Sequence, residues 1–276
     1  MSITLDQLAE EARAGNRDSL EALVRGLQDP MYRLALRILG HPEQARDATQ
    51  EILILVITQL SSFRGESSIK TWAYRVATRH VLRMRSRARR WTFESLADDD
   101  LGQPPNAIEP ETLAHADARL LEEETFLGCT QAMLQALDAD KRIAFVLGAI
   151  CELDSHEAAD ILEISEAAFR KRLSRARAEL DAFVGKHCGV ADPANRCRCA
   201  HQVNLNVARG CVDPARLTYA LSSRKTTVEA LRALGEIREV RRSLELYRAQ
   251  PAFEAPADYA SAIRSMIDRA TSLSVS

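Results

Sequence analysis

The chain has 276 residues, of which 46% are hydrophobic, 28% are charged and 5% are aromatic. This length suggests two or three domains, and the composition suits a soluble helical protein. The formal net charge of −2 does not by itself indicate a nucleic-acid binder, but it hides a segregation of charge. Residues 64–90 hold nine Lys or Arg and one acid, whereas residues 94–124 are strongly acidic. Because screening limits electrostatic reach to about 10 Å, these local charges matter more than the total.

The sequence lacks the signals of a secreted or membrane protein. Its N-terminus is polar and acidic, without the basic and apolar regions of a signal peptide. The longest apolar run, residues 52–57, is far shorter than the roughly 20 residues that span a bilayer. We therefore expect a cytosolic protein with no membrane partner, in which six cysteines favour reduced thiols or metal ligands over a disulfide framework.

The N-terminal third shows apolar residues at helical spacing, with a break at Gly15 and Asn16. Pro30 suits the first turn of a following helix, which should end near Gly40. The apolar run 52–57 resembles a buried strand, but the helical pattern before it and the lack of turn residues favour a helix. We predict helices over residues 2–28, 30–39, 43–60 and 70–90, with a loop over residues 63–68.

Residues 92–112 have the composition of a flexible linker, with Asp98–Asp100, Gly102, Pro104 and Pro110 but no sustained periodicity. Helical patterns resume over residues 113–137 and 141–151. No internal repeat and no convincing strand is found, so the predicted fold class is all-α.

A pair of short helices is predicted between Asp154 and Phe183, joined at residues 163–165. Asp154 and Ser165 can cap the two helices, because their side-chain oxygens accept hydrogen bonds from free backbone N–H groups. Such a pair with a basic outer face has the layout of a DNA-binding helix-turn-helix, and an ordinary solvated charged face is the alternative. The second helix should bury Phe169, Leu173, Ala176, Leu180 and Phe183 and should expose Arg170, Lys171, Ser174 and Arg175.

A segment rich in cysteine and histidine follows, in a loop that contains Gly, Pro and Asn. Zinc takes four nitrogen or sulfur ligands, and a metal could fold such a loop. The spacing is not that of a standard zinc finger, so redox-sensing thiols and inert reduced cysteines are alternatives. Cys129 and Cys151 lie in predicted helices and are expected to be small core residues. The predicted metal ligands, for Zn or another metal, are Cys188, Cys197, Cys199 and His201, with His187 and Cys211 as alternatives.

The remaining residues predict a long amphipathic helix over residues 227–249 and a last helix after Pro256, which carries Tyr259, Ile263, Met266 and Ile267. This region is too long and too apolar for a solvated tail. We hypothesise that it folds back on the preceding regions and regulates them.

Two stretches together resemble a known family. The sequence Asp47-Ala48-Thr49-Gln50-Glu51, the loop 62–68 and the stretch 71–77 closely resemble region two of bacterial RNA polymerase sigma factors of the extracytoplasmic-function (ECF) group. The stretch from Ile164 to Arg177 resembles region four of the same group. Both motifs in this order, separated by a linker, are a stronger signal than either alone. The resemblance covers about residues 15–185.

The resemblance implies two helical domains joined by a flexible linker and followed by a helical C-terminal extension. It implies a factor, not an enzyme, that binds core RNA polymerase and directs initiation by reading the minus-ten and minus-thirty-five promoter elements. Core RNA polymerase and promoter DNA are the implied partners, an anti-sigma factor is a further candidate, and some ECF groups carry regulatory Cys-rich extensions. The predicted domains are residues 1–91 (region two), 92–112 (linker), 113–185 (region four) and 186–276 (extension).

In region two, the resemblance places Asp47, Gln50 and Glu51 on the helix that docks onto the clamp of the largest polymerase subunit, with a solvated helix face as the alternative. The following loop and helix match the part that melts and reads the minus-ten element, where stacking on aromatic or Arg planes offsets a base-extrusion cost of a few kcal/mol. Trp72 shares a side with Val76, which favours the core. The implied DNA contacts are Phe63, Arg64, Trp72, Tyr74, Arg75, Arg79 and Arg83, with Arg85, Arg87, Arg89 and Arg90 on phosphates.

In region four, the resemblance implies that Ser165, Arg170, Lys171, Ser174 and Arg175 meet the major groove of the minus-thirty-five element. An Arg–guanine pair there contributes about 1–3 kcal/mol of discrimination.

The chain departs from the family pattern at several positions. Glu163 stands where the helix-turn-helix usually has Gly, and it would need an unusual backbone, since other residues disfavour positive φ. Arg79 replaces a common Asn in region two, and Lys171 replaces a small residue. Ala167-Ala168 replaces Gly-Thr. These departures concern the promoter sequence that is read and leave the implied mechanism unchanged.

Two competing functions are weaker. A stand-alone helix-turn-helix regulator would not need the Asp47–Glu51 helix or the melting loop. A metalloenzyme centred on the Cys/His segment would need a general base near its ligands, and none is apparent.

Overall fold

The computed structural model describes residues 3–84, 91–97, 108, 110–113, 116–220, 242–255, 259 and 261–265. Within these ranges the chain is helical, and its one β feature is an isolated parallel bridge between Cys188 and Cys197. The all-α prediction is therefore confirmed. None of the helices described there is long and apolar enough to cross a membrane.

The chain divides into two compact units. The first unit comprises residues 1–88, 153–168 and 252–276, and the second comprises residues 89–152 and 169–251. Each unit thus combines segments that are distant in sequence, and the four consecutive domains drawn from the sequence stay a prediction.

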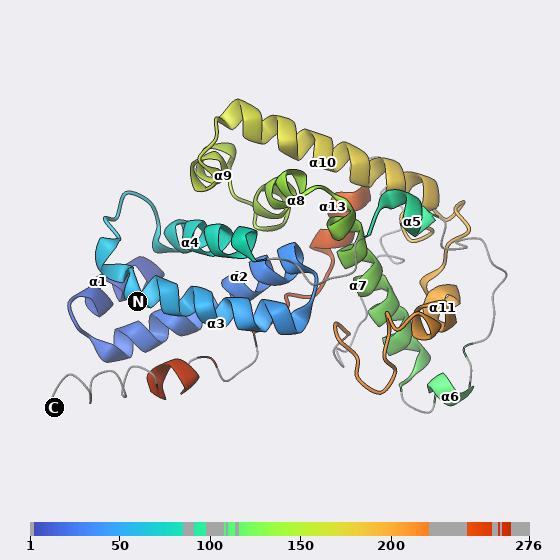
Figure 1. Cartoon of the computed structure of the whole chain (residues 1–276), viewed down its shortest axis with the longest axis horizontal. Helices are drawn as coiled ribbons and strands as arrows, with labels where there is room; N and C mark the ends of the chain where they lie inside the picture. The colour runs from blue at the N-terminus through green and yellow to red at the C-terminus, as the bar shows by residue number, and fades with distance from the viewer. Residues whose placement is uncertain are drawn as a thin grey trace. The chain divides into compact units, whose positions relative to one another are not determined.

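The first unit is built on α2, which packs against α1, α3 and α4 (Figure 1). Side-chain oxygens of Thr4 and Asn16 cap α1 and α2, and Gly40 ends α2 in the left-handed region at φ 72°. The apolar run 52–57 is helical, as predicted. The elements are α1 (Leu5–Arg13), α2 (Arg17–Leu39), α3 (Pro42–Thr58), the 3-10 turn η1 (Leu60–Ser62) and α4 (Ile69–Arg83).

The predicted helix boundary at Pro30 is wrong, because α2 runs through it. A proline inside a helix costs about 3 kcal/mol through the lost N–H bond and ring crowding. Leu27, Met31 and Leu34 on both sides of Pro30 are fully buried. Each such side chain contributes about 1.5–3 kcal/mol, so packing of the continuous apolar face offsets the penalty.

The second unit begins with α5 (Phe93–Ala97), inside the predicted linker, and α6 (Pro110–Leu113), at its end. The flexible linker over residues 92–112 stays a prediction. Within it, the ring of Phe93 lies against that of Phe183, with centroids 5.3 Å apart. Most of the rest of the linker lies outside the described residues. The unit continues with α7 (Ala118–Ala136), α8 (Ala139–Phe145) and the π-helical turn η2 (Val146–Ile150).

Two helices complete the predicted helix-turn-helix, α9 (Ser155–Leu162) and α10 (Glu166–His187). They are followed by η3 (Cys199–Gln202), α11 (Val203–Ala208) and α13 (Arg242–Arg248). Of the long helix predicted over 227–249, residues 227–241 lie outside the described residues, as do Arg85, Arg87, Arg89, Arg90, Met266 and Ile267.

The C-terminal extension is held to the second unit by buried polar contacts. The carboxylate of Glu124, which is 1% exposed, accepts the backbone N–H groups of Thr218, Tyr219 and Ala220 at 2.7–2.8 Å. On α13, the Tyr247 hydroxyl donates to the Thr130 carbonyl at 2.8 Å. Residues 218–220 and α13 are therefore packed against α7.

The last described residues belong to the first unit, and we call residues 252–255, 259 and 261–265 the C-terminal strap. Phe253 and Tyr259 are buried. Arg33 Nε donates to the Phe253 carbonyl at 2.8 Å, and the Tyr259 hydroxyl donates to the Arg46 carbonyl at 2.7 Å. The strap therefore packs on α2 and α3, beside the predicted polymerase-binding residues.

Candidate nucleic-acid interface

The turn between α9 and α10 follows from its local sequence. Asp154 Oδ1 caps α9 by accepting the N–H groups of His156 and Glu157 at 2.8 Å, and Ser165 Oγ accepts the Ala168 N–H at 3.2 Å. Both predicted caps are confirmed. Glu163 ends α9 at φ 56° and ψ 42°, the left-handed conformation that a residue other than Gly adopts at a cost. The predicted backbone irregularity at Glu163 is therefore present.

Helix α10 has the predicted two faces. Phe169, Leu173, Ala176 and Leu180 are buried, with Val184 as the next buried position, whereas Phe183 is half-buried and stacks on His187. The opposite face presents the predicted DNA-reading side chains, which are all exposed: Arg170, Lys171, Ser174 and Arg175, with Ser165 exposed at the turn.

Not every basic residue of α10 belongs to this exposed face. Arg172 pairs with Asp140 at 2.8 Å, and Lys141 of α8 pairs with Glu179 at 2.6 Å. Gly148 in η2 lies against the buried face, because a Cβ there would be 2.9 Å from side-chain carbons of Leu173 and Phe169. These contacts fix the orientation of α10 within the second unit and leave its basic face outward.

Helix α4 begins at a well-capped end. Ser68 Oγ accepts the Thr71 N–H at 3.0 Å, and Asp6 Oδ1 of α1 accepts the Ile69 N–H at 2.7 Å. Phe63 is only 4% exposed and its ring lies 5.7 Å from that of Trp72, which is half-buried.

The predicted minus-ten contacts divide by exposure. Arg64, Arg79 and Arg83 are exposed and Arg75 is half-buried. Phe63 and Tyr74 are each 4% exposed and contribute to the core. Their DNA contacts stay a prediction that would require their release from this packing.

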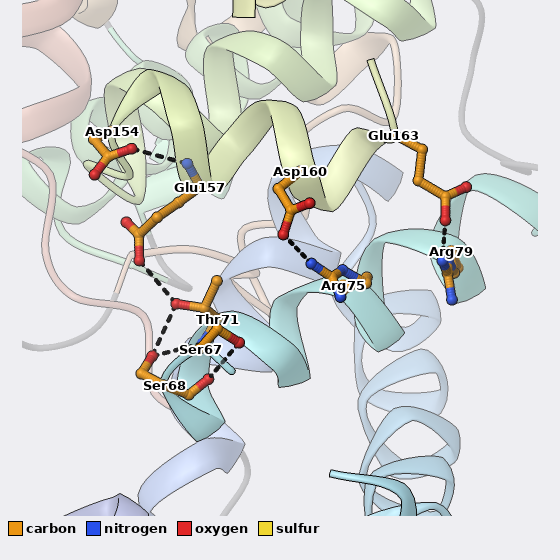
Figure 2. A network of polar contacts seen from close by, with 9 residues as sticks. All are labelled: Ser67, Ser68, Thr71, Arg75, Arg79, Asp154, Glu157, Asp160 and Glu163. Carbon is orange, nitrogen blue, oxygen red and sulfur yellow. Dashed lines mark hydrogen bonds and ion pairs between the residues drawn. The ribbon is translucent and has the colours of Figure 1, made fainter. Parts of the chain in front are cut away.

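One side of α4 is covered by an acidic row on α9, formed by Glu157, Asp160 and Glu163 (Figure 2). Thr71 Oγ1 donates to Glu157 Oε1 at 3.0 Å. The Arg75 guanidinium pairs with Asp160, and that of Arg79 pairs with Glu163. Sequence reasoning missed this role of the acidic row. The spacing of three residues between its members was the available signal, since it places them on one face of a helix.

The predicted polymerase-binding residues lie on α3. Asp47 and Glu51 are exposed, and Gln50 is half-buried. Glu51 lies 3.1 Å from His80 Nε2 of α4. The three residues thus form an acidic and polar surface on one helix, as the pattern predicts for a docking face.

The cysteine segment does not form a ligand cluster in this arrangement. Across the described part of the chain, no group of three or more His, Cys, Asp or Glu is placed to hold a metal ion. Cys188 and Cys197 are joined by their backbone bridge, and a Cβ on Gly189 would lie 2.0 Å from the Cys197 carbonyl oxygen. Burial raises the pKa of the Cys188 and Cys199 thiols and raises that of Cys197 to about 11. The metal site, with His201 as its fourth ligand, stays a prediction.

Comparison with known proteins matches both regions. The Sigma-70 region 2 family model matches residues 23–91, and the Sigma-70, region 4 model matches residues 127–180.

Curated relatives agree with these matches. ECF RNA polymerase sigma factor SigE of Mycolicibacterium smegmatis is 32% identical over 61% of this chain and 63% of its own length. RNA polymerase sigma factor YlaC of Bacillus subtilis is 29% identical over 60% of this chain and 91% of its own. RNA polymerase sigma factor CnrH of Cupriavidus metallidurans is 30% identical over 64% of this chain and 92% of its own. With both regions matched in order, the chain belongs to the ECF group of the sigma-70 family of RNA polymerase sigma factors.

Proposed function

We propose that this sigma factor binds core RNA polymerase through α3 and directs promoter-specific initiation. In this proposal the loop 63–68 and α4 read the minus-ten element, and α10 reads the minus-thirty-five element. The observation that carries it is the exposed basic face of α10, which lies opposite a fully formed buried face. The protein would act in the cytoplasm, where core polymerase and DNA are found.

The chemistry of the two surfaces supports this division. An α-helix enters the major groove, and Arg175 and Arg170 can each donate two hydrogen bonds to a guanine edge. Asp47 and Glu51 give α3 a negative surface suited to a basic partner helix. Electrostatic complementarity of that kind favours correct association with the polymerase.

In vitro transcription with purified core polymerase and a genomic DNA library tests the proposal. We expect new transcript starts that share two upstream sequence elements and depend on the protein. Replacing Asp47 and Glu51 by Ala should weaken core binding, whereas Glu43→Ala on the same helix serves as the matched control. A protein that neither binds core nor creates new starts would refute the proposal.

We also propose that the C-terminal extension regulates this activity. The support is that its described residues are packed, Glu124 holding residues 218–220 and Tyr259 bonding to the Arg46 carbonyl one residue from Asp47. Transcription and core binding by a chain that ends at residue 251 test the strap, and deletion of residues 186–276 tests the whole extension. Activity unchanged under all metal and redox conditions would exclude regulation. An anti-sigma factor stays a candidate partner.

A further inference from the structure

Helix α9 presents its acidic row to the same side of α4 that carries Thr71, Arg75 and Arg79 (Figure 2). We propose that this row masks the DNA-reading side of α4 in the free protein and must be displaced before α4 can bind the minus-ten element. The inference deepens the proposed function and rests on it, because it assumes that α4 meets DNA.

The residues of the acidic row and their partners on α4 are regularly spaced, so that each acid meets one α4 residue. The α4 residues lie four apart and the α9 residues three apart, so each set forms one stripe along its helix. Rising numbers pair with rising numbers, from Thr71 with Glu157 to Arg79 with Glu163, so the two helices run in the same direction. The acidic row therefore contacts α4 from Thr71 in its first turn to Arg79, which lies one turn before its end.

The backbone at the end of α9 supports a dedicated contact. Glu163 occupies a left-handed conformation that Gly adopts without strain and that Glu adopts at a cost. At this strained position its carboxylate pairs with Arg79. At the other end, Glu157 follows the Asp154 cap by three residues and places its carboxylate on the buried Thr71 hydroxyl.

Carboxylates of the acidic row bind the arginines of α4 in the same way as DNA phosphates would. A guanidinium binds a carboxylate and a phosphate through the same N–H donors, so Arg75 and Arg79 cannot fully serve both partners. Carboxylates on α9 thus compete with nucleic acid for these side chains. Covered guanidiniums would lower the affinity of free sigma factor for DNA that lacks polymerase.

The mask is weak enough to be removed. The side chains of Asp160, Arg79 and Glu163 are 59%, 50% and 67% exposed, and exposed ion pairs are weak and screened by salt. For a ligand that binds only the open state, the apparent affinity equals the intrinsic affinity multiplied by the fraction of protein in the open state. A mask closed about 70–90% of the time therefore lowers apparent DNA affinity about 3–10-fold.

The test compares binding of a fluorescent mixed-sequence single-stranded 20-mer by full-length variants at low salt. The variant Glu157→Gln/Asp160→Asn/Glu163→Gln should bind about 3–10-fold more tightly than the wild type. The control variant Glu10→Gln/Asp18→Asn/Glu254→Gln makes the same charge change at three exposed acids outside the acidic row. Equal affinities of the triple variant and this control would overturn the mask.

A second measurement uses the wild type and does not depend on the variant folding. Because coupling is reciprocal, saturating 20-mer should speed amide hydrogen exchange in residues 155–163 and leave residues 5–13 unchanged. Unchanged exchange in α9 while the DNA is bound overturns the inference. Absence of core binding together with absence of DNA binding by every variant would instead reject the proposed function.

Discussion

The Arg79 guanidinium on α4 pairs with the carboxylate of Glu163 at the end of α9. Both residues depart from the pattern of the family that the chain resembles, where Asn and Gly are usual. Two departures that are 84 residues apart in sequence thus contact each other. Their meeting gives Glu163 a role that explains why a strained backbone position carries a charged side chain.

Replacing Glu163 by Gly should relieve the backbone strain at this position and also remove the carboxylate that pairs with Arg79. Gly removes a left-handed penalty of about 1 kcal/mol, while the exposed pair with Arg79 contributes about 0–1 kcal/mol. We expect unfolding in urea to show equal or slightly higher stability, together with tighter binding of single-stranded DNA. Glu163→Asn, which also tolerates this backbone, should behave similarly. A loss of more than about 1 kcal/mol would contradict this account.

Replacing Gly148 by Ala should destabilise the second unit. The new Cβ would lie 2.9 Å from both Leu173 and Phe169, and such overpacking costs about 1–3 kcal/mol. The matched change is Gly128→Ala in α7, where the nearest atom is 4.0 Å away and helix propensity should add up to about 1 kcal/mol. Thermal unfolding of the two variants should shift in opposite directions.

Replacing Glu124 by Gln should release the extension at residues 218–220. The carboxylate accepts three backbone N–H groups, and a hydrogen bond to a charged group contributes about 1.5–3 kcal/mol. The Gln side chain has an NH₂ group in place of one carboxylate oxygen. This group would face a backbone N–H, so at least one of the three hydrogen bonds would be lost. Limited proteolysis should cut near residues 218–220 faster, whereas Glu94→Gln, at an exposed position of α5, should leave cleavage unchanged.

The docking of Tyr259 should depend on pH only in the alkaline range. Burial raises the pKa of its phenol above the usual 10.0, with Tyr32 adding to the rise and Arg46 opposing it. Because the folded pKa is the higher one, the stabilisation is fully present below about pH 10 and is lost as pH rises through the folded value. Phenolate absorbance compared with Tyr259→Phe measures this. Titration at an ordinary tyrosine pKa would show that the strap is undocked.

Replacing Arg175 by Ala should weaken promoter recognition by α10. One bidentate guanine contact contributes about 1–3 kcal/mol, so binding of holoenzyme to its promoter should fall about 5–150-fold. Lys186→Ala, also exposed on α10 but outside the predicted reading positions, should have little effect. Equal losses from both variants would indicate a purely electrostatic contribution.

Much of the fold could be predicted because its signals are local. The helical pattern of α10, the caps at Asp154 and Ser165, and the irregular turn at Glu163 depend on residues within a few positions of one another. The continuation of α2 through Pro30 could not be predicted. It depends on the burial of Leu27 and Met31, which other helices provide.

The sequence by itself determined the all-α fold class, the two faces of α10 and the family, since periodicity and motif spacing are properties of a single segment. Only the tertiary structure decided that Asp160 meets Arg75 and that Glu124 holds residues 218–220. Local spacing shows that a row of charges shares one face of a helix, but it does not say which distant row faces it. That choice follows from packing of the whole unit, which buries apolar surface and fixes the charged rows in register.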